Sequence, residues 1–222
     1  MKHYYQRDVL YGREGKWTSF VGGHKGDGEP LGLGGIRVEA RQGAAKMWVE
    51  TCHDCTTGKQ VNRFVVHVWD HADGAKLRYR VDDGQWRNYD TALRRNEVAH
   101  ATQLIIAAPA PGPHRLTIER VARGRGALVL LGVVLEADTG ASVDSIGLVG
   151  RRLSELHARD WKTVSSQLAQ RQPSLIVLQY GTNEADDAST DLAALARRYD
   201  AVIADIRSSL PTASILVLGP PD

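Results

Sequence analysis

The four residues Gly181-Thr182-Asn183-Glu184 directly follow an apolar run at 174–180. A short run of aliphatic residues of this kind is typical of a buried strand in a parallel sheet. In open α/β sheets, ligands bind where the strands end. The carboxamide of Asn183 carries two hydrogen-bond donors, so we expect it at a site that binds an oxygen acquiring negative charge. The alternative interpretation is a turn-forming role only, because Gly-x-Asn suits tight turns.

A second segment with donor groups is Ser145-Ile146-Gly147-Leu148-Val149-Gly150. Its apolar spacing predicts a helix over 148–158, and the first N–H groups of a helix have no partner within that helix. We therefore expect the N–H beside Gly147 to point toward the amide of Asn183. Losing one such donor typically costs about 3–4 kcal/mol of transition-state stabilisation in acyl transfer. Gly147 could instead serve only to permit a tight bend between a strand and a helix.

These two segments resemble sequence blocks of the SGNH/GDSL hydrolases. Gln179-Tyr180-Gly181-Thr182-Asn183-Glu184 is similar to the third block, written G-x-N-D or G-x-N-E, and residues 144–150 are similar to the second block. The resemblance implies a three-layer α/β/α fold in which Gly147 and Asn183 are oxyanion donors. It also implies acyl ester substrates, in particular acetyl esters of carbohydrate or cell-wall glycan. No metal and no organic cofactor is implied.

The nucleophile and the base of that family have no counterpart in the sequence. Gly26-Asp27-Gly28 has glycine where the G-D-S motif has serine, and no D-x-x-H motif occurs anywhere. We therefore expect a fragment that lacks both ends of the hydrolase and is itself inactive. Val143-Asp144-Ser145 offers Ser145 as an alternative nucleophile, but Val143 replaces the motif's glycine. A serine that caps backbone donors at a helix start is the favoured interpretation of Ser145.

The elements expected around these segments are those of an α/β domain at 138–222. Besides 148–158, helices are predicted over 162–171 and 191–210, and the buried strands over 174–180 and 214–218. A strand–helix–strand order predicts a parallel sheet with right-handed crossovers. Because two parallel strands do not make a stable domain, we expect this α/β part to be incomplete.

Residues 1–137 are predicted to form a β-sandwich with a jelly-roll arrangement. Short strands separated by turn residues are typical of sandwiches, and they are predicted over 64–69, 76–81, 85–89, 103–107, 114–120 and 127–135. Asp82-Asp83-Gly84 predicts a hairpin turn between two of them. By resemblance, this half is similar to the carbohydrate-binding-module-like domain inserted in peptidoglycan O-acetylesterase-like members of the family. Its tryptophans, including Trp48 and Trp86, are interpreted as packing residues, with sugar stacking as the alternative.

Composition excludes some partners and leaves others open. The 222 residues carry a net charge of +2, which argues against nucleic acid as a partner. No apolar run approaches the ~20 residues of a membrane helix, and no signal peptide is visible; resemblance alone favours the periplasm, the envelope or secretion. Cys52 and Cys55 predict a local disulfide or two inert thiols rather than a redox or zinc site. The second functional hypothesis is a non-catalytic β-sandwich module that binds carbohydrate or protein beside a remnant α/β scaffold.

Overall fold

The computed structural model of the chain describes residues 9–22, 30–52, 55–56, 58–122 and 126–220. Its internal contacts divide the chain into two compact units. The first comprises Met1–Phe20 and Ile36–Ile146, and the second comprises Val21–Gly35 and Gly147–Asp222. Residues 21–35 thus belong with the C-terminal residues, whereas the predicted division places everything before 138 in one β domain. That division stays a prediction about domain architecture.

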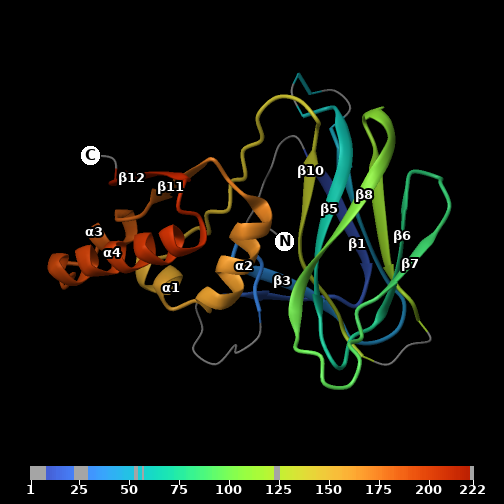
Figure 1. Cartoon of the computed structure of the whole chain (residues 1–222), viewed down its shortest axis with the longest axis horizontal. Coiled ribbons are helices and arrows are strands. Elements are labelled where there is room, and N and C mark those ends of the chain that lie inside the picture. Colours follow the sequence, from blue (N-terminus) through green and yellow to red (C-terminus); the bar gives the residue numbers. More distant parts are fainter. Residues whose placement is uncertain (1–8, 23–29, 53–54, 57, 123–125, 221–222) are drawn as a thin grey trace. The chain divides into compact units, whose positions relative to one another are not determined.

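The first unit contains two five-stranded antiparallel sheets (Figure 1). One sheet has the strand order β1 (Val9–Gly15), β4 (Ala45–Thr51), β9 (Arg115–Arg120), β6 (Lys76–Val81) and β7 (Arg87–Asp90). The other has the order β2 (Thr18–Val21), β3 (Ile36–Ala40), β10 (Leu128–Glu136), β5 (Val61–Asp70) and β8 (His100–Gly112). The predicted β-sandwich is therefore confirmed, while its jelly-roll topology stays a prediction.

Alternating side chains of both sheets form the core of the sandwich. Phe64, Leu77 and Leu116 are almost completely buried in one cluster. Strand β10 contributes to two clusters, because Leu128 belongs to this core and Val129 to a second cluster beyond it. The prediction of a strand buried on both faces at 127–135 is thereby confirmed for its first half.

The hairpin of β6 and β7 is formed as its turn residues predict. Asp82 adopts a positive φ of 50°, and the N–H of Gly84 donates to the carbonyl of Val81 at 3.0 Å. The carboxylate of Asp82 also accepts from the N–H of Arg115 at 2.9 Å. The turn is therefore held to the neighbouring strand β9 as well as closed on itself.

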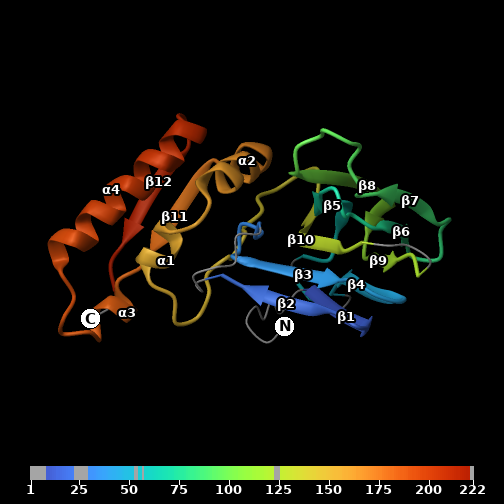
Figure 2. The same cartoon turned by 90° about the horizontal axis from the view of Figure 1, so that it is seen from below.

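The second unit is an α/β arrangement (Figure 2). Strands β11 (Leu175–Gln179) and β12 (Ser214–Leu218) pair in parallel. The helices are α1 (Leu153–His157), α2 (Trp161–Arg171), α3 (Thr182–Ala185) and α4 (Leu192–Ser209). The parallel pair and the helices predicted over 162–171 and 191–210 are confirmed to within one or two residues. The three-layer α/β/α arrangement is not seen in the described residues and stays a prediction.

One face of the two-stranded sheet packs on the helices and the other is open. Leu178 lies in a core with Leu153, Val202 and Ile206 of the helices. On the opposite face, the exposed fractions of the apolar residues lie between 39% and 54%; these residues are Leu175, Val177, Leu216 and Leu218. Parallel strands in proteins are normally covered on both faces, so this face is unusually exposed.

The segment at 30–35 is held to the α/β unit by long side chains of its helical region. The guanidinium of Arg159 donates to the carbonyls of Leu33 at 2.7 Å and Gly32 at 2.6 Å. The buried amide of Gln167 in α2 donates to the carbonyl of Leu31 at 2.8 Å. Backbone carbonyls without regular secondary structure thus find their partners in side chains.

Cys52 and Cys55 form a disulfide across a separation of three residues, just after β4. Of the two predicted outcomes, a local disulfide or two inert thiols, the disulfide is the one that is formed. Within the described residues, no helix has both the length and the apolar character needed to cross a membrane.

Candidate functional site

The segment around Gly147 is not where the sequence pattern places it relative to a helix. Helix α1 begins at Leu153, so the prediction of a helix from residue 148 is wrong by five residues. A turn at Val149–Gly150 intervenes, in which Gly150 has a φ of +76° that a helix does not accommodate. Gly147 is exposed, and no atom lies within 4 Å of the position of a Cβ added to it. Its N–H therefore does not stand at a helix start.

Asn183 lies in the first turn of α3, directly after β11. Its side-chain amide donates a hydrogen bond to the carbonyl of Arg151 at 2.8 Å. A carboxamide nitrogen has two hydrogens, so this bond orients the group and leaves one hydrogen for another acceptor. The contact joins the loop after β11 to Arg151, whereas the expected approach of the Gly147 N–H to Asn183 stays a prediction.

Glu184 strengthens the same junction from inside the protein. Its carboxylate is buried, with one oxygen accepting from the N–H of Leu153 at 2.7 Å and the other from the N–H of Gly181 at 3.1 Å. A buried charge is tolerated when hydrogen bonds replace water. Glu184 therefore connects the start of α1 to the loop that follows β11.

An ion pair at the surface completes this junction. Arg152 donates to the carboxylate of Asp187 at 2.8 Å, and Ser189 donates to the same side chain through its hydroxyl. The hydrogen bonds from Ser189 and Arg152 lower the pKa of Asp187 to about 2. Because these bonds favour the ionised carboxylate, Arg152 and Asp187 stay paired at neutral pH.

Among the described residues, neither Ser145 nor the side chain of His157 hydrogen-bonds to a member of this junction. Ser145 is exposed and has no hydrogen-bond partner among them, and the expected helix cap at this serine is wrong because α1 starts eight residues later. Among the described histidines, His157 lies in the same compact unit, exposed in the last turn of α1. Gly26-Asp27-Gly28 lies outside the described residues. No group of three or more His, Cys, Asp or Glu in the described part could hold a metal ion.

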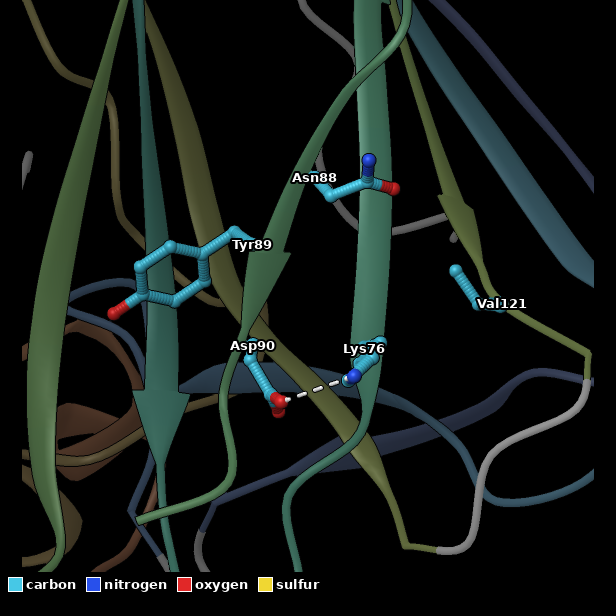
Figure 3. Close-up of a pocket in the computed structure, with 5 residues that line it drawn as sticks. All are labelled: Lys76, Asn88, Tyr89, Asp90 and Val121. Carbon is cyan, nitrogen blue, oxygen red and sulfur yellow. Dashed lines mark ion pairs between the residues drawn. The ribbon is translucent and has the colours of Figure 1, made fainter. Parts of the chain in front are cut away.

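A second candidate site lies in the β-sandwich. The hairpin of β6 and β7 borders a hollow of about 470 Å³, whose lining includes Lys76, Asn88, Asp90 and Val121 (Figure 3). The ammonium of Lys76 and the carboxylate of Asp90 face each other at 3.8 Å. The side chain of Tyr89 points away from these groups (Figure 3), toward the interior, where its hydroxyl donates to Asp70 at 2.6 Å.

Comparison with known proteins gives a fold and no family assignment. No family model matches the sequence, and no curated protein matches it. A solved structure described as peptidoglycan O-acetylesterase in action is similar over 100% of this chain, with 21% identity and a TM-score of 0.63. The chain spans 56% of the length of that protein. At this level of identity the similarity shows a shared fold.

Weaker similarities extend to other carbohydrate-active proteins. A family two carbohydrate esterase from Clostridium thermocellum in complex with cellohexaose is similar over 92% of this chain and 78% of its own, with 13% identity and a TM-score of 0.32. The protein TmCBM61 in complex with β-1,4-galactotriose is similar over 61% of this chain and 100% of its own, with 12% identity and a TM-score of 0.35.

Sequence reasoning missed the most connected residue of the α/β site. Glu184 was recognised only as the fourth letter of a motif, although it holds two backbone donors. Its place directly after Asn183 was a usable signal, because a carboxylate next to a buried strand must find partners. The hollow on the β6–β7 hairpin was missed as well, although the alternation of Lys76, Arg78 and Arg80 marks an outward face.

Proposed function

We propose that residues 138–222 provide the oxyanion-binding part of an SGNH/GDSL-type serine ester hydrolase. The proposed substrates are acyl esters, in particular acetyl esters, of carbohydrate or cell-wall glycan. The observation that carries the proposal is the hydrogen bond from Asn183 to the carbonyl of Arg151. It joins Asn183, in the segment that resembles the third block, to the residue that directly follows the segment resembling the second block.

The chemistry follows from the donors at this junction. When a serine oxygen attacks an ester carbonyl, the carbonyl oxygen becomes negative and needs fixed donors, while a histidine accepts the serine proton. The free hydrogen of the Asn183 amide and the backbone N–H of Gly147 are the donors we propose. Glu184 acts as a positioning residue, because it fixes the loop that carries Asn183 to the start of α1.

The serine and histidine of this reaction must come from outside the 222 residues, because the sequence contains neither G-D-S nor D-x-x-H. The chain alone is then expected to be inactive. The fold shared with a peptidoglycan O-acetylesterase supports the choice of acetyl esters and of a cell-wall or extracellular setting. No metal and no organic cofactor enters the proposed reaction.

The first test uses the 222-residue chain and a chromogenic acetyl ester. We expect no turnover above the solvent rate, either from the natural chain or from Ser145→Ala. Turnover that disappears in Ser145→Ala would make Ser145 a nucleophile and contradict the proposal. The DNA flanking the reading frame gives a second test, in which G-D-S is expected upstream and D-x-x-H downstream.

The decisive test uses a form of the protein extended by those two motifs. Asn183→Ala should lower kcat about 10²–10³-fold, as loss of one oxyanion donor does. Gly147→Pro, which removes the backbone N–H, should have a comparable effect, whereas Gly147→Ala keeps the N–H and meets no neighbouring atom. An extended enzyme that is indifferent to Asn183→Ala would refute the assignment.

The second candidate function is a non-catalytic binding module. The hollow on the β6–β7 hairpin is the observation that favours it, because it lies in the β-sandwich and not in the α/β unit. The two functions separate experimentally. Ester turnover that depends on Asn183 supports the hydrolase, and glycan binding without turnover in the extended form supports the module.

A further inference from the structure

The outward face of the β6–β7 hairpin carries a set of polar side chains that the hydrolase proposal does not use. The strand register places Lys76 opposite Asp90 and Arg78 opposite Asn88. Residues opposite each other in an antiparallel pair project to the same face. Leu77, the intervening residue, is buried in the core. The four polar side chains are therefore presented together, away from the interior.

These side chains border the hollow in a way that suits a ligand with many hydroxyl groups. Figure 3 shows Asn88, Asp90 and Lys76 on the hairpin; with Tyr89 and Val121 they line the hollow. The ammonium donates, the carboxylate accepts and the amide does both. A sugar hydroxyl also donates and accepts. The hollow is an open depression with a volume of about 470 Å³.

An aromatic ring stands next to this hollow on the same face. Trp86 precedes β7 and lies two positions before Asn88, and its ring contacts the outward guanidinium groups of Arg78 at 4.4 Å and Arg80 at 4.8 Å. Cations over an indole are attracted by its π-electrons and restrict its orientation. Residues two positions apart along an extended chain are separated by about 6.6 Å. Trp86 is thus near Asn88 along the hairpin, although it is not one of the residues that line the hollow.

The charges of the face favour a neutral ligand. Lys76 lies 3.8 Å from Asp90, Arg78 pairs with Glu119 at 2.6 Å, and Arg80 lies 3.7 Å from Asp83. Each cation has an acidic neighbour, so no excess charge is available to select an acidic polymer. A ring that stacks together with paired polar groups that bind hydroxyls is what a neutral oligosaccharide requires.

We propose that the outward face of the β6–β7 hairpin binds a neutral oligosaccharide, with one sugar stacked on Trp86 and the hydroxyls of its neighbour bound by Asn88, Lys76 and Asp90. This site is independent of Asn183 and Gly147, which lie in the other compact unit. If the protein is part of a glycan esterase, this site would hold the polymer near the enzyme. The binding itself does not require that the chain takes part in ester hydrolysis.

The test is a titration of the full 222-residue chain with two probes, a β-1,4-linked N-acetylglucosamine hexamer and a β-1,4-linked glucose hexamer. Binding is measured by calorimetry and by amide chemical shifts. We expect at least one probe to bind, with shifts concentrated in β6 and β7. Trp86→Ala should weaken binding about tenfold or more, as truncation of an anchoring aromatic does.

Matched variants separate the site from general effects on the fold. Asn88→Ala should weaken binding, whereas Gln85→Ala, an exposed amide in the turn of the same hairpin, should leave it unchanged. Trp48→Ala removes a tryptophan that stacks with Arg115 instead, and it should retain binding. No binding of either probe up to about 10 mM, which is too weak for a specific site, would overturn the proposal. Equal losses in Trp48→Ala and Trp86→Ala would also overturn it.

Discussion

The buried carboxylate of Glu184 accepts the backbone N–H of Leu153 at 2.7 Å, across 31 positions of sequence. Through this bond the first residue of α1 is fixed to the loop that leaves β11. The second oxygen binds the N–H of Gly181, which starts that loop. One side chain thus connects the loop that carries Asn183 to the start of α1, six residues after Gly147.

We expect Glu184→Gln to destabilise the α/β unit. Glutamine keeps one acceptor oxygen, but its amide group would face the other backbone donor and leave it unsatisfied. Hydrogen bonds to a charged group are worth about 1.5–3 kcal/mol, and a loss in this range should appear as a lower midpoint in urea unfolding. Asp186→Asn is the control, because Asp186 is an exposed acid next in the same loop. Equal stability of the two variants would contradict the role of Glu184.

Gly181 occupies a backbone conformation that other residues rarely adopt, with a φ of +120°. A Cβ at this position would lie 2.8 Å from Cδ of Pro220. Gly181→Ala should therefore cost about 1–3 kcal/mol of unfolding free energy. The control is Gly219→Ala, where an added Cβ meets no atom within 4 Å. If both variants unfold at the same urea concentration, the strained conformation is not required.

Because of Asp187, the stability of the α/β unit should decrease at acidic pH. Its folded-state pKa of about 2 lies below the ordinary value of 3.8, because Ser189 and Arg152 bind the ionised form. Its contribution is therefore fully present above about pH 4 and is lost as the pH falls through about 2. Asp187→Asn should be less stable than the natural chain near pH 6, and the difference should shrink toward pH 2. A difference that does not change with pH, measured by urea unfolding, would contradict this.

The buried Asp70 of the sandwich should make Tyr89 important for stability. One oxygen of Asp70 accepts from Tyr89 and from Thr102, each at 2.6 Å. Burial, followed by the hydrogen bond to Asp70, raises the pKa of Tyr89 to about 12. Tyr89→Phe should cost about 1.5–3 kcal/mol, because it removes a donor from a buried carboxylate. Tyr79→Phe is the control, because no described residue hydrogen-bonds its hydroxyl.

The pH dependence of the Tyr89 contribution has the opposite sign to that of Asp187. Because the folded-state pKa is raised above 10.0, the stabilisation is fully present below about pH 10 and is lost as the pH rises through about 12. The stability difference between the natural chain and Tyr89→Phe should therefore narrow in this range. The Tyr89 hydroxyl is bound to Asp70, whereas the rest of the side chain also lines the hollow, and Tyr89→Phe keeps the ring; the variant should therefore still bind oligosaccharide. Loss of that binding would show that the hydroxyl of Tyr89, and not only its ring, is needed for the ligand.

Patterns of period two and apolar runs were sufficient to find much of the fold. The alternation at 76–81 matches β6 residue for residue, and the run at 214–218 matches β12. Strand β1 was missed because its sequence, VLYGREG, contains two glycines and two charged residues that hide the alternation. Such strands are stabilised by pairing with β4, a contact distant in sequence. Composition alone cannot reveal it.

The candidate site, too, depends on contacts between residues that are distant in sequence, and these could not be predicted. The motif letters located Asn183 and Gly147, but the helix predicted from residue 148 was wrong because Gly150 turns the chain with a positive φ. The backbone conformation of a glycine inside an apolar pattern cannot be predicted from the pattern itself. The bonds from Asn183 to Arg151 and from Glu184 to Leu153 depend on the fold bringing distant segments together. No local pattern encodes that approach.

The bonds that hold residues 31–33 to Arg159 and Gln167 span 126 to 136 positions, with the strands β3 to β10 in between. During synthesis, the earlier segment leaves the ribosome well before its partners exist. At about 5–20 residues per second, the wait is several seconds or more. The sandwich strands can pair within that time, whereas the α/β unit cannot be finished until α2 emerges. Folding in the cell should therefore complete the sandwich before the α/β unit.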